Sequence, residues 1–224
     1  MIILIGSEKG GVGKSTLATN LAVTLKLHKS DVVIVDADRQ STSANWAQDR
    51  DETSLIKIDC IRQYDNLKPT LERLQERYKF VIVDCQGRVS KEMRTGLLAA
   101  HAVIVPFKPS QLDLDTLPAM LDIIKEAQDF NSTLKPYALM TMCPTNPHMT
   151  EISQAREFFT NHPDISLLDT IIYERKIYRD ATSSGLGVVE LDNEKATIEI
   201  ESLLKEFIKK YNASTKEELK WQIK

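Results

Sequence analysis

The feature that most constrains this chain is the change from an apolar run to a glycine-rich turn near its start. Residues 2–5 (IILI) predict a buried strand, and the turn KGGVGKST at 9–16 leads into apolar residues at helical spacing. Glycines let backbone N–H groups curl around a phosphate chain, and the N-terminus of the next helix directs its dipole at the same anion. The order strand, turn, helix therefore predicts a phosphate-binding loop for a nucleotide.

Two side chains of this turn have a defined chemistry in such a loop. Lys14 is expected to reach the β- and γ-phosphates, and the Ser15 hydroxyl is expected to bind Mg²⁺. The predicted nucleotide-binding residues are Gly10, Gly11, Val12, Gly13, Lys14, Ser15 and Thr16.

Two further apolar runs end in acidic residues. Residues 32–35 (VVIV) precede Asp36 and Asp38, and residues 80–83 (FVIV) precede Asp84. Such runs are typical of strands covered on both faces, and acids beyond their carboxyl ends lie where open α/β sheets bind ligands. We expect Asp84 to hold Mg²⁺ through a water or to accept a hydrogen bond from Ser15. A helix cap and a surface turn are the alternative for Asp36 and Asp38.

The remaining periodicities complete an alternation of strands and helices. Further strands are predicted at 55–61 (nearer an edge), 102–106, 137–142 and 167–172. Helices are predicted at 14–27, 41–50, 67–78, 112–127, 152–159 and 196–224, the last with a break at 212–214. This alternation predicts an α/β fold, a mostly parallel twisted sheet with helices on both faces, in one domain over 1–224. Trp46, Met140 and Met142 are expected in the core.

Composition limits the function classes. A chain of 224 residues fits one α/β domain, and a net charge of −3 means that any nucleic-acid binding must come from a local patch. The 3 cysteines form no CxxC pair, which argues against a zinc site or a disulfide framework. No signal peptide and no apolar run of about 20 residues is present, so we expect a cytoplasmic protein.

The glycine-rich turn departs from the generic P-loop, because position 8 holds Glu8 in place of the first glycine and Lys9 follows. This sequence resembles the deviant P-loop of the ParA/MinD ATPase superfamily. The motif order and the short length are similar to those of small ParF-like (type Ib) plasmid partition proteins. The resemblance implies that Lys9 reaches the nucleotide of a partner subunit, that Asp38 orients the attacking water and that Asp36 lies nearer the metal. Arg39 stands where many relatives have proline, which adds a charge at the mouth of the site.

The resemblance also implies a function. We expect a weak Mg²⁺-dependent ATPase, with Lys9, Lys14 and Asp38 as catalytic residues and Ser15, Asp36 and Asp84 at the metal. The ATP-bound homodimer would bind nonspecific DNA on the nucleoid, and a centromere-binding ParB-type partner would stimulate hydrolysis. The segment 141–144 would lie near the adenine. Arg175, Lys176 and Arg179 form the best local basic cluster for DNA, with an ordinary solvated face as the alternative.

Three other interpretations remain open. A MinD-like ATPase would cycle on and off a membrane, but the apolar face of the final segment, with Leu219, Trp221 and Ile223, is small for an anchor. A metabolic enzyme on the same P-loop, such as a dethiobiotin-synthetase-like ligase, would need a set of substrate-binding polar groups that the sequence does not show. A cargo-positioning ATPase would move a protein assembly in place of a plasmid.

Overall fold

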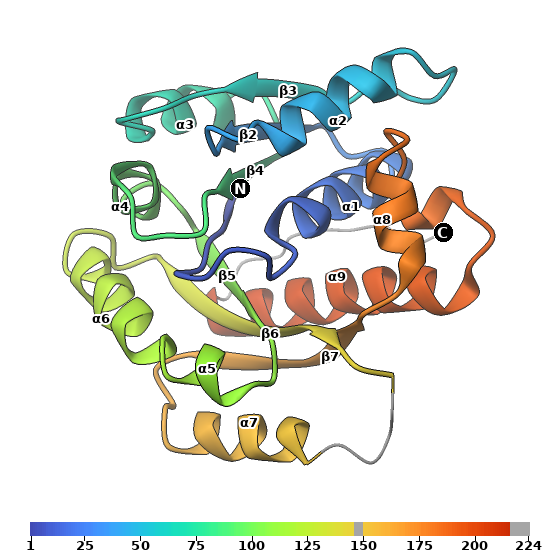
Figure 1. Ribbon diagram of the computed structural model, residues 1–224. Coiled ribbons are helices and arrows are strands. Elements are labelled where there is room, and N and C mark those ends of the chain that lie inside the picture. The colour runs from blue at the N-terminus through green and yellow to red at the C-terminus, as the bar shows by residue number, and fades with distance from the viewer. Residues whose placement is uncertain (146–149, 216–224) are drawn as a thin grey trace.

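The computed structural model describes residues 1–145 and 150–215. Its strands form one sheet in the order β3-β2-β4-β1-β5-β6-β7, and every neighbouring pair is parallel (Figure 1). The predicted parallel α/β fold is therefore confirmed. The strands are β1 (Ile2–Ile5), β2 (Val32–Ala37), β3 (Asp59–Arg62), β4 (Phe80–Cys85), β5 (Ala102–Phe107), β6 (Lys135–Cys143) and β7 (Ser166–Tyr173).

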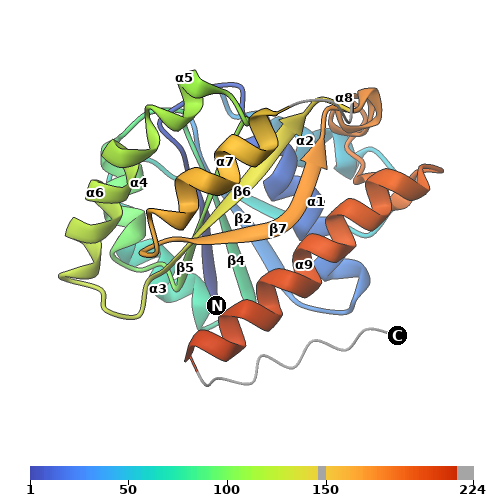
Figure 2. The same cartoon turned by 90° about the horizontal axis from the view of Figure 1, so that it is seen from below.

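Helices cover both faces of this sheet, because successive strand residues point to opposite sides. In β1, Ile3 and Ile5 pack into one core, and Ile2 and Leu4 pack into the other. The first core lies under α1 (Lys14–Leu27), α2 (Thr42–Asp51), α8 (Lys176–Thr182), η1 (Val188–Glu190) and α9 (Glu194–Thr215). The second lies under α3 (Lys68–Gln75), α4 (Lys91–Leu97), α5 (Gln111–Leu114), α6 (Leu117–Gln128) and α7 (Glu151–Thr160). Figure 2 shows these two layers on either side of the strands.

Two predicted elements were wrong in extent, and two observed helices were not predicted. The strand expected at 55–61 is the shorter β3, although its place at the sheet edge is confirmed. The helix expected at 112–127 is divided into α5 and α6, because Pro118 lies in the first turn of α6 and cannot donate a helical hydrogen bond to an earlier turn. Two short helices, α4 and α8, had no counterpart in the sequence prediction.

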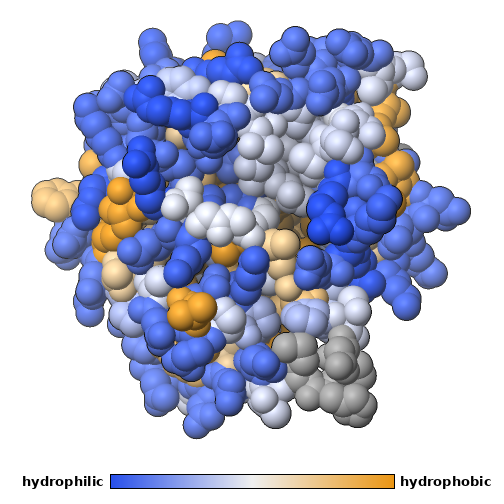
Figure 3. Space-filling view, in the orientation of Figure 1, coloured by the Kyte–Doolittle hydropathy of each residue, from blue (hydrophilic) through white to orange (hydrophobic). Residues whose placement is uncertain are grey.

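The break expected at 212–214 is also wrong, since α9 continues to Thr215. The hydroxyls of Ser214 and Thr215 donate to the carbonyl of Tyr211 at 2.8 and 2.9 Å, which satisfies them inside the helix. Residues 216–224, on which the membrane interpretation depended, lie outside the described residues. None of the helices in the described ranges is long and apolar enough to cross a membrane. On the face drawn in Figure 3, apolar residues form small separate patches.

Trp46 anchors α2 in the core as predicted. Its ring is 1% exposed, and its indole N–H donates to the carbonyl of Leu186 at 3.0 Å. Met140 is fully buried as expected, but the prediction for Met142 was wrong, because it has a φ of 51° and lines a pocket beside the glycine-rich turn. Arg50, which follows Trp46 by one turn of α2, lies with its guanidinium 5.4 Å from that ring.

Arg50 also forms a buried ion pair that the sequence did not predict. Its guanidinium donates to both carboxylate oxygens of Glu190, at 2.6 and 2.8 Å, and to the carbonyls of Ile56 and Gly185. The two side chains are only 1% and 8% exposed. Because all of these partners lie in other segments, Arg50 joins α2 to η1 and to the loop before β3.

We expect Arg50→Met to lower the free energy of unfolding by about 3–5 kcal/mol, because it leaves the Glu190 carboxylate buried without its partner. Urea unfolding measures this change. The double variant Arg50→Met/Glu190→Gln should lose less than the two single variants summed, and the exposed Arg73→Met serves as the control. A loss below about 1 kcal/mol in Arg50→Met, which is the range of a surface pair, would contradict the prediction.

Candidate nucleotide-binding site

The glycine-rich turn lies between β1 and α1, as predicted. Gly11 and Gly13 have φ values of 71° and 84°, a left-handed conformation that glycine adopts without strain. Gly13 caps α1, whose first turn carries no acidic residue. The positive end of the helix dipole is therefore available to an anion in this loop. Thr141 at the end of β6 fastens the loop by donating to the carbonyl of Val12 at 2.8 Å.

Lys14 is held by the loop that it follows. Its ammonium donates to the carbonyl of Lys9 at 2.8 Å and to the hydroxyl of Ser7 at 3.3 Å, and its side chain is buried. Burial lowers the pKa of Lys14, while the negative charges of Asp84 and Asp38 oppose that shift. The cation is thus placed at the loop before any phosphate arrives, with two acids near enough to stabilise its charge.

Gly87, two residues beyond the end of β4, supports the loop, a role that the sequence prediction missed. A Cβ at this position would lie 2.6 Å from the Cα of Gly10 and 2.7 Å from the carbonyl oxygen of Lys9. Real Cβ atoms do not approach other atoms this closely, so only glycine allows the loop to rest on this backbone. The sequence did contain a signal for this role, because the glycine comes soon after an apolar run that ends in an aspartate.

Asp84, at the end of β4, is fully buried beside the loop. Its Oδ2 accepts a hydrogen bond from the hydroxyl of Ser43 at 2.7 Å, whereas Oδ1 has no hydrogen-bond partner among the described residues. Burial raises the pKa of Asp84 to about 7, and the neighbouring hydroxyls of Ser43 and Ser15 oppose that shift. A buried carboxylate oxygen without a partner, next to a serine hydroxyl, is a donor set that suits Mg²⁺. Ser15 and Asp84 therefore fit the metal predicted for this site.

Asp36 and Asp38 have different surroundings although they are two residues apart. Both oxygens of Asp36 accept backbone N–H groups, from Asp38 at 3.0 Å and from Ala44 in the first turn of α2 at 2.7 Å. Asp36 thus caps α2, and its place near a metal stays a prediction. Among the described residues, the carboxylate of Asp38 accepts a hydrogen bond from its own loop alone, from the N–H of Gln40 at 2.9 Å, and Asp38 lines the cavity above the glycine-rich turn.

The raised pKa of Asp84 predicts a pH dependence of stability. The folded chain holds this proton up to about pH 7, whereas an unfolded aspartate releases it near pH 4. The folded state therefore binds more protons between these values, and the protein without ligands should lose stability as the pH rises from 5 to 7. Urea unfolding of Asp84→Asn, a neutral isostere, should show a smaller loss over this range. The exposed Asp49→Asn is the control, and equal slopes in Asp84→Asn and the natural chain would refute the assignment.

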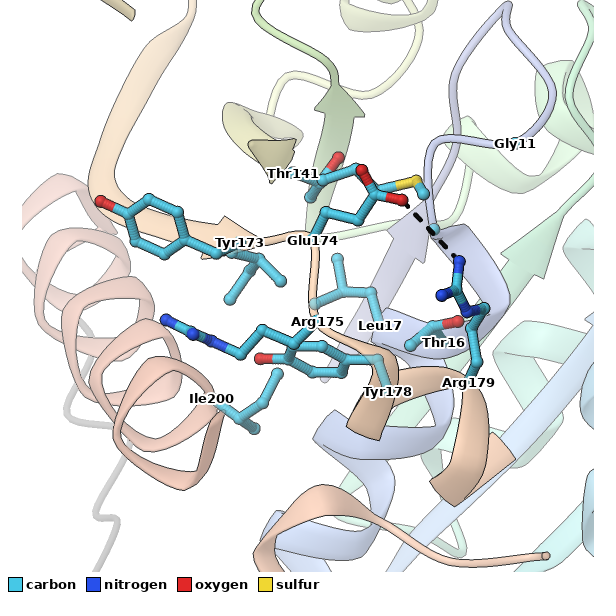
Figure 4. A pocket seen from close by; sticks show the side chains of 13 residues that line it. Gly11, Thr16, Leu17, Thr141, Tyr173, Glu174, Arg175, Tyr178, Arg179 and Ile200 are labelled. Atoms are coloured by element: carbon cyan, nitrogen blue, oxygen red, sulfur yellow. Dashed lines mark ion pairs between the residues drawn. The ribbon is translucent and has the colours of Figure 1, made fainter. Parts of the chain in front are cut away.

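Two cavities meet at the glycine-rich turn, and Gly11, Gly13 and Thr16 line both. The larger has a volume of about 680 Å³ and holds the phosphate-binding side chains. The smaller, of about 260 Å³, is mostly apolar and lies between α1, the ends of β6 and β7, α8 and α9 (Figure 4). It includes Thr141 and Met142, from the segment expected near the adenine. Its other lining residues are Leu17, Ile172, Tyr173, Glu174, Arg175, Tyr178, Arg179 and Ile200.

The three residues proposed for DNA do not form one basic surface. Arg175 extends toward Tyr173 and α9 (Figure 4), where its guanidinium pairs with Glu199 at 2.6 Å. Lys176 and Arg179 are exposed on α8, although Lys176 pairs with Asp180 at 2.9 Å and Arg179 lies 3.8 Å from Glu174. Arg175 and Arg179 both line the smaller cavity, but Arg175 is held by Glu199, whereas Lys176 and Arg179 have exposed side chains.

The fold and this site together define a P-loop nucleotide-binding protein, with the loop at the carboxyl edge of a parallel sheet and an aspartate on the neighbouring strand. The model of the CobQ/CobB/MinD/ParA nucleotide binding domain matches residues 3–212, and the chain belongs to this family. The predicted ParA/MinD membership and the ATPase class are thereby confirmed.

Individual relatives show how widely the similarity extends. The chain is 26% identical over 211 residues to the maintenance of carboxysome distribution protein A of Halothiobacillus neapolitanus, covering 92% of this chain and 95% of that protein. McdA of Cyanothece has a similar fold, with a TM-score of 0.74, 16% identity and coverage of 92% and 98%. A plasmid partition protein of Borrelia burgdorferi bound to AMPPNP has a TM-score of 0.70, 20% identity and coverage of 93% and 98%.

Proposed function

We propose that this chain is a Mg²⁺-dependent ATPase that dimerises around ATP and binds DNA nonspecifically in that state. The observation that carries the proposal is the joining of two cavities across the glycine-rich turn, one apolar and one lined by Lys14, Ser15 and Asp38. Together they suit a base at one end and a phosphate chain at the other. The AMPPNP bound to the Borrelia relative supports ATP as the nucleotide.

Each side chain of the site has a distinct task in this proposal. Lys14 moves its ammonium from the loop carbonyl to the phosphates, and Ser15 and Asp84 would hold the metal, which neutralises phosphate charge when bound. Asp38 orients the attacking water, since its carboxylate lies in the phosphate cavity. The ammonium of Lys9 forms no hydrogen bond or ion pair within the described part of the chain, so we assign it to the nucleotide of a second copy.

The accessible cations of α8 are the proposed contact with DNA. Lys176 and Arg179 have side chains that are 81% and 71% exposed, and exposed ion pairs of this kind are weak enough to yield to a phosphate backbone. They lie on the helix that borders the smaller cavity, so a nucleotide in that cavity would be next to the DNA contact. Arg175 is left out, because its charge is already paired with Glu199.

The cargo defines two candidates within this function. The Borrelia relative supports plasmid partition, in which a centromere-binding partner stimulates hydrolysis and releases the dimer from DNA. The relative named for carboxysome distribution, together with McdA, supports the positioning of a protein assembly. The two are told apart by which partner raises the ATPase rate, a DNA-bound centromere protein or a component of an assembly.

Binding to nonspecific duplex DNA with ATP, ADP or no nucleotide tests the proposal. We expect tight DNA binding with Mg²⁺-ATP and weak binding with ADP or without nucleotide. The affinity for DNA should fall steeply as the salt concentration rises, because contacts to DNA phosphates release counterions. Lys176→Ala should weaken DNA binding and leave nucleotide affinity unchanged, because Lys176 lines neither cavity, whereas Lys68→Ala on α3 should change neither. Equal DNA binding with and without ATP would overturn the nucleotide-gated function.

A further inference from the structure

Two arginines stand at the mouth of the phosphate cavity in addition to the residues assigned above. Arg39 follows Asp38 directly, Arg88 follows Gly87, and both line the cavity that contains Lys14. Both side chains are exposed, and neither forms an ion pair within the described residues. Within the described residues neither guanidinium is held in a carboxylate pair, unlike the cations of Lys176 and Arg179, although Arg39 interacts electrostatically with Glu92.

Arg39 is the better placed of the two. Its guanidinium lies 5.0 Å from the centre of the Tyr64 ring, and Tyr64 is itself joined to Ser41 by a hydrogen bond between hydroxyls at 3.2 Å. A cation over an aromatic face is positioned without losing its N–H donors. The hydrogen bond from Gln40 to Asp38 keeps the same loop in place. Arg88 has no comparable support in the described structure.

The two cavities set the direction of a bound nucleotide. A base in the smaller cavity places the phosphate chain over Gly11, Gly13 and Thr16, which are shared by both cavities. The chain of phosphates then ends in the larger cavity, on the side of Asp38 and Arg39. The last phosphate carries the charge by which ATP differs from ADP, and a guanidinium binds phosphate through two parallel hydrogen bonds.

We propose that Arg39 contacts the terminal phosphate of the bound nucleotide and makes the site distinguish a triphosphate from a diphosphate. This inference rests on the proposed function, because it assumes a nucleoside triphosphate in the joined cavities. Arg39 acts on the nucleotide of its own subunit, and it is separate from the role assigned to Lys9.

The test measures the affinities of AMPPNP and ADP, each with Mg²⁺, for the natural chain and three variants by isothermal titration calorimetry. We expect Arg39→Ala to weaken AMPPNP binding about tenfold, because it removes a charge-assisted hydrogen bond to the terminal phosphate. ADP lacks that phosphate, so its affinity should change less than twofold. Arg39→Lys should restore part of the difference, since it keeps the charge but not the paired donors. Arg73→Ala, on the exposed face of α3, should match the natural chain.

Three outcomes would overturn the inference. Unchanged affinities in Arg39→Ala would show that the guanidinium does not touch the nucleotide, and unchanged affinities with weaker DNA binding would assign it to a macromolecular partner. An equal loss for both nucleotides would show a general effect on the cavity without discrimination. If the natural chain bound neither nucleotide, the proposed function would fail together with the inference, whereas the first three results leave that function intact.

Discussion

Lys9→Ala is expected to abolish ATP-dependent dimerisation and to lower ATP turnover by about a thousandfold, comparable to the loss of a cation supplied in trans to a transferring phosphate. The backbone carbonyl of Lys9 holds Lys14 and Ser7 inside the subunit, while its ammonium has no partner in the described residues. Alanine keeps that carbonyl. The substitution should therefore remove the contribution to the second copy and leave the loop in place.

Turnover per chain, measured over a range of protein concentrations, separates the two parts of this role. The natural chain should become more active per molecule as dimers form with ATP, whereas Lys9→Ala should show a low rate at every concentration. Light scattering with AMPPNP reports the dimer directly. Lys68→Ala is the matched control, because this lysine lies on the solvent side of α3 with 45% of its side chain exposed. If Lys9→Ala dimerised and hydrolysed ATP like the natural chain, the cross-subunit assignment would be wrong.

Asp38→Ala is expected to slow hydrolysis by about 10²–10⁴-fold, the range for loss of a group that assists proton transfer. Nucleotide binding should persist, because Lys14, Ser15 and Asp84 remain. The ATP-bound dimer should then survive long after the natural dimer has dissociated. A chase with excess ADP, followed by size-exclusion chromatography, measures the lifetime of that dimer.

Asp38→Asn separates the charge of this residue from its structural contact. An asparagine oxygen can still accept the N–H of Gln40, which Asp38 binds at 2.9 Å, so the loop should keep its shape. We expect Asp38→Asn to be as slow as Asp38→Ala, because both lack the carboxylate. Hydrolysis at the natural rate in either variant would refute the role of Asp38 in positioning water.

The sequence was a reliable guide to features that depend on neighbours along the chain. The glycine-rich turn, its lysine and serine, and the aspartate near the end of β4 were all predicted, because a strand, a turn and a helix cap are defined by consecutive residues. The parallel sheet followed from the alternation of buried runs with helices. Boundaries were less well predicted, as β3 and the continuation of α9 show, because short elements depend on tertiary contacts as well as on local preference.

The ion pairs between side chains of distant segments were not predicted from the sequence. Arg50 pairs with Glu190, 140 positions away, and Arg175 pairs with Glu199 on a helix that packs beside it. The sequence alone does not show whether a basic side chain is exposed to solvent or paired with a distant acid. Arg175 therefore seemed suited to DNA when only the sequence was considered.

What the sequence by itself determined is that Lys14, Ser15 and Asp84 meet at the carboxyl edge of the sheet, since the strands that carry them to that edge are parallel and their connections have one favoured hand. Only the tertiary structure decided which charges are available for binding. Burial neutralises or pairs some of them, as in Arg50 and Arg175, and leaves others, such as Arg39, open to a ligand. The physical reason is desolvation: a charge withdrawn from water needs a partner, and that partner is chosen by the packing of distant segments.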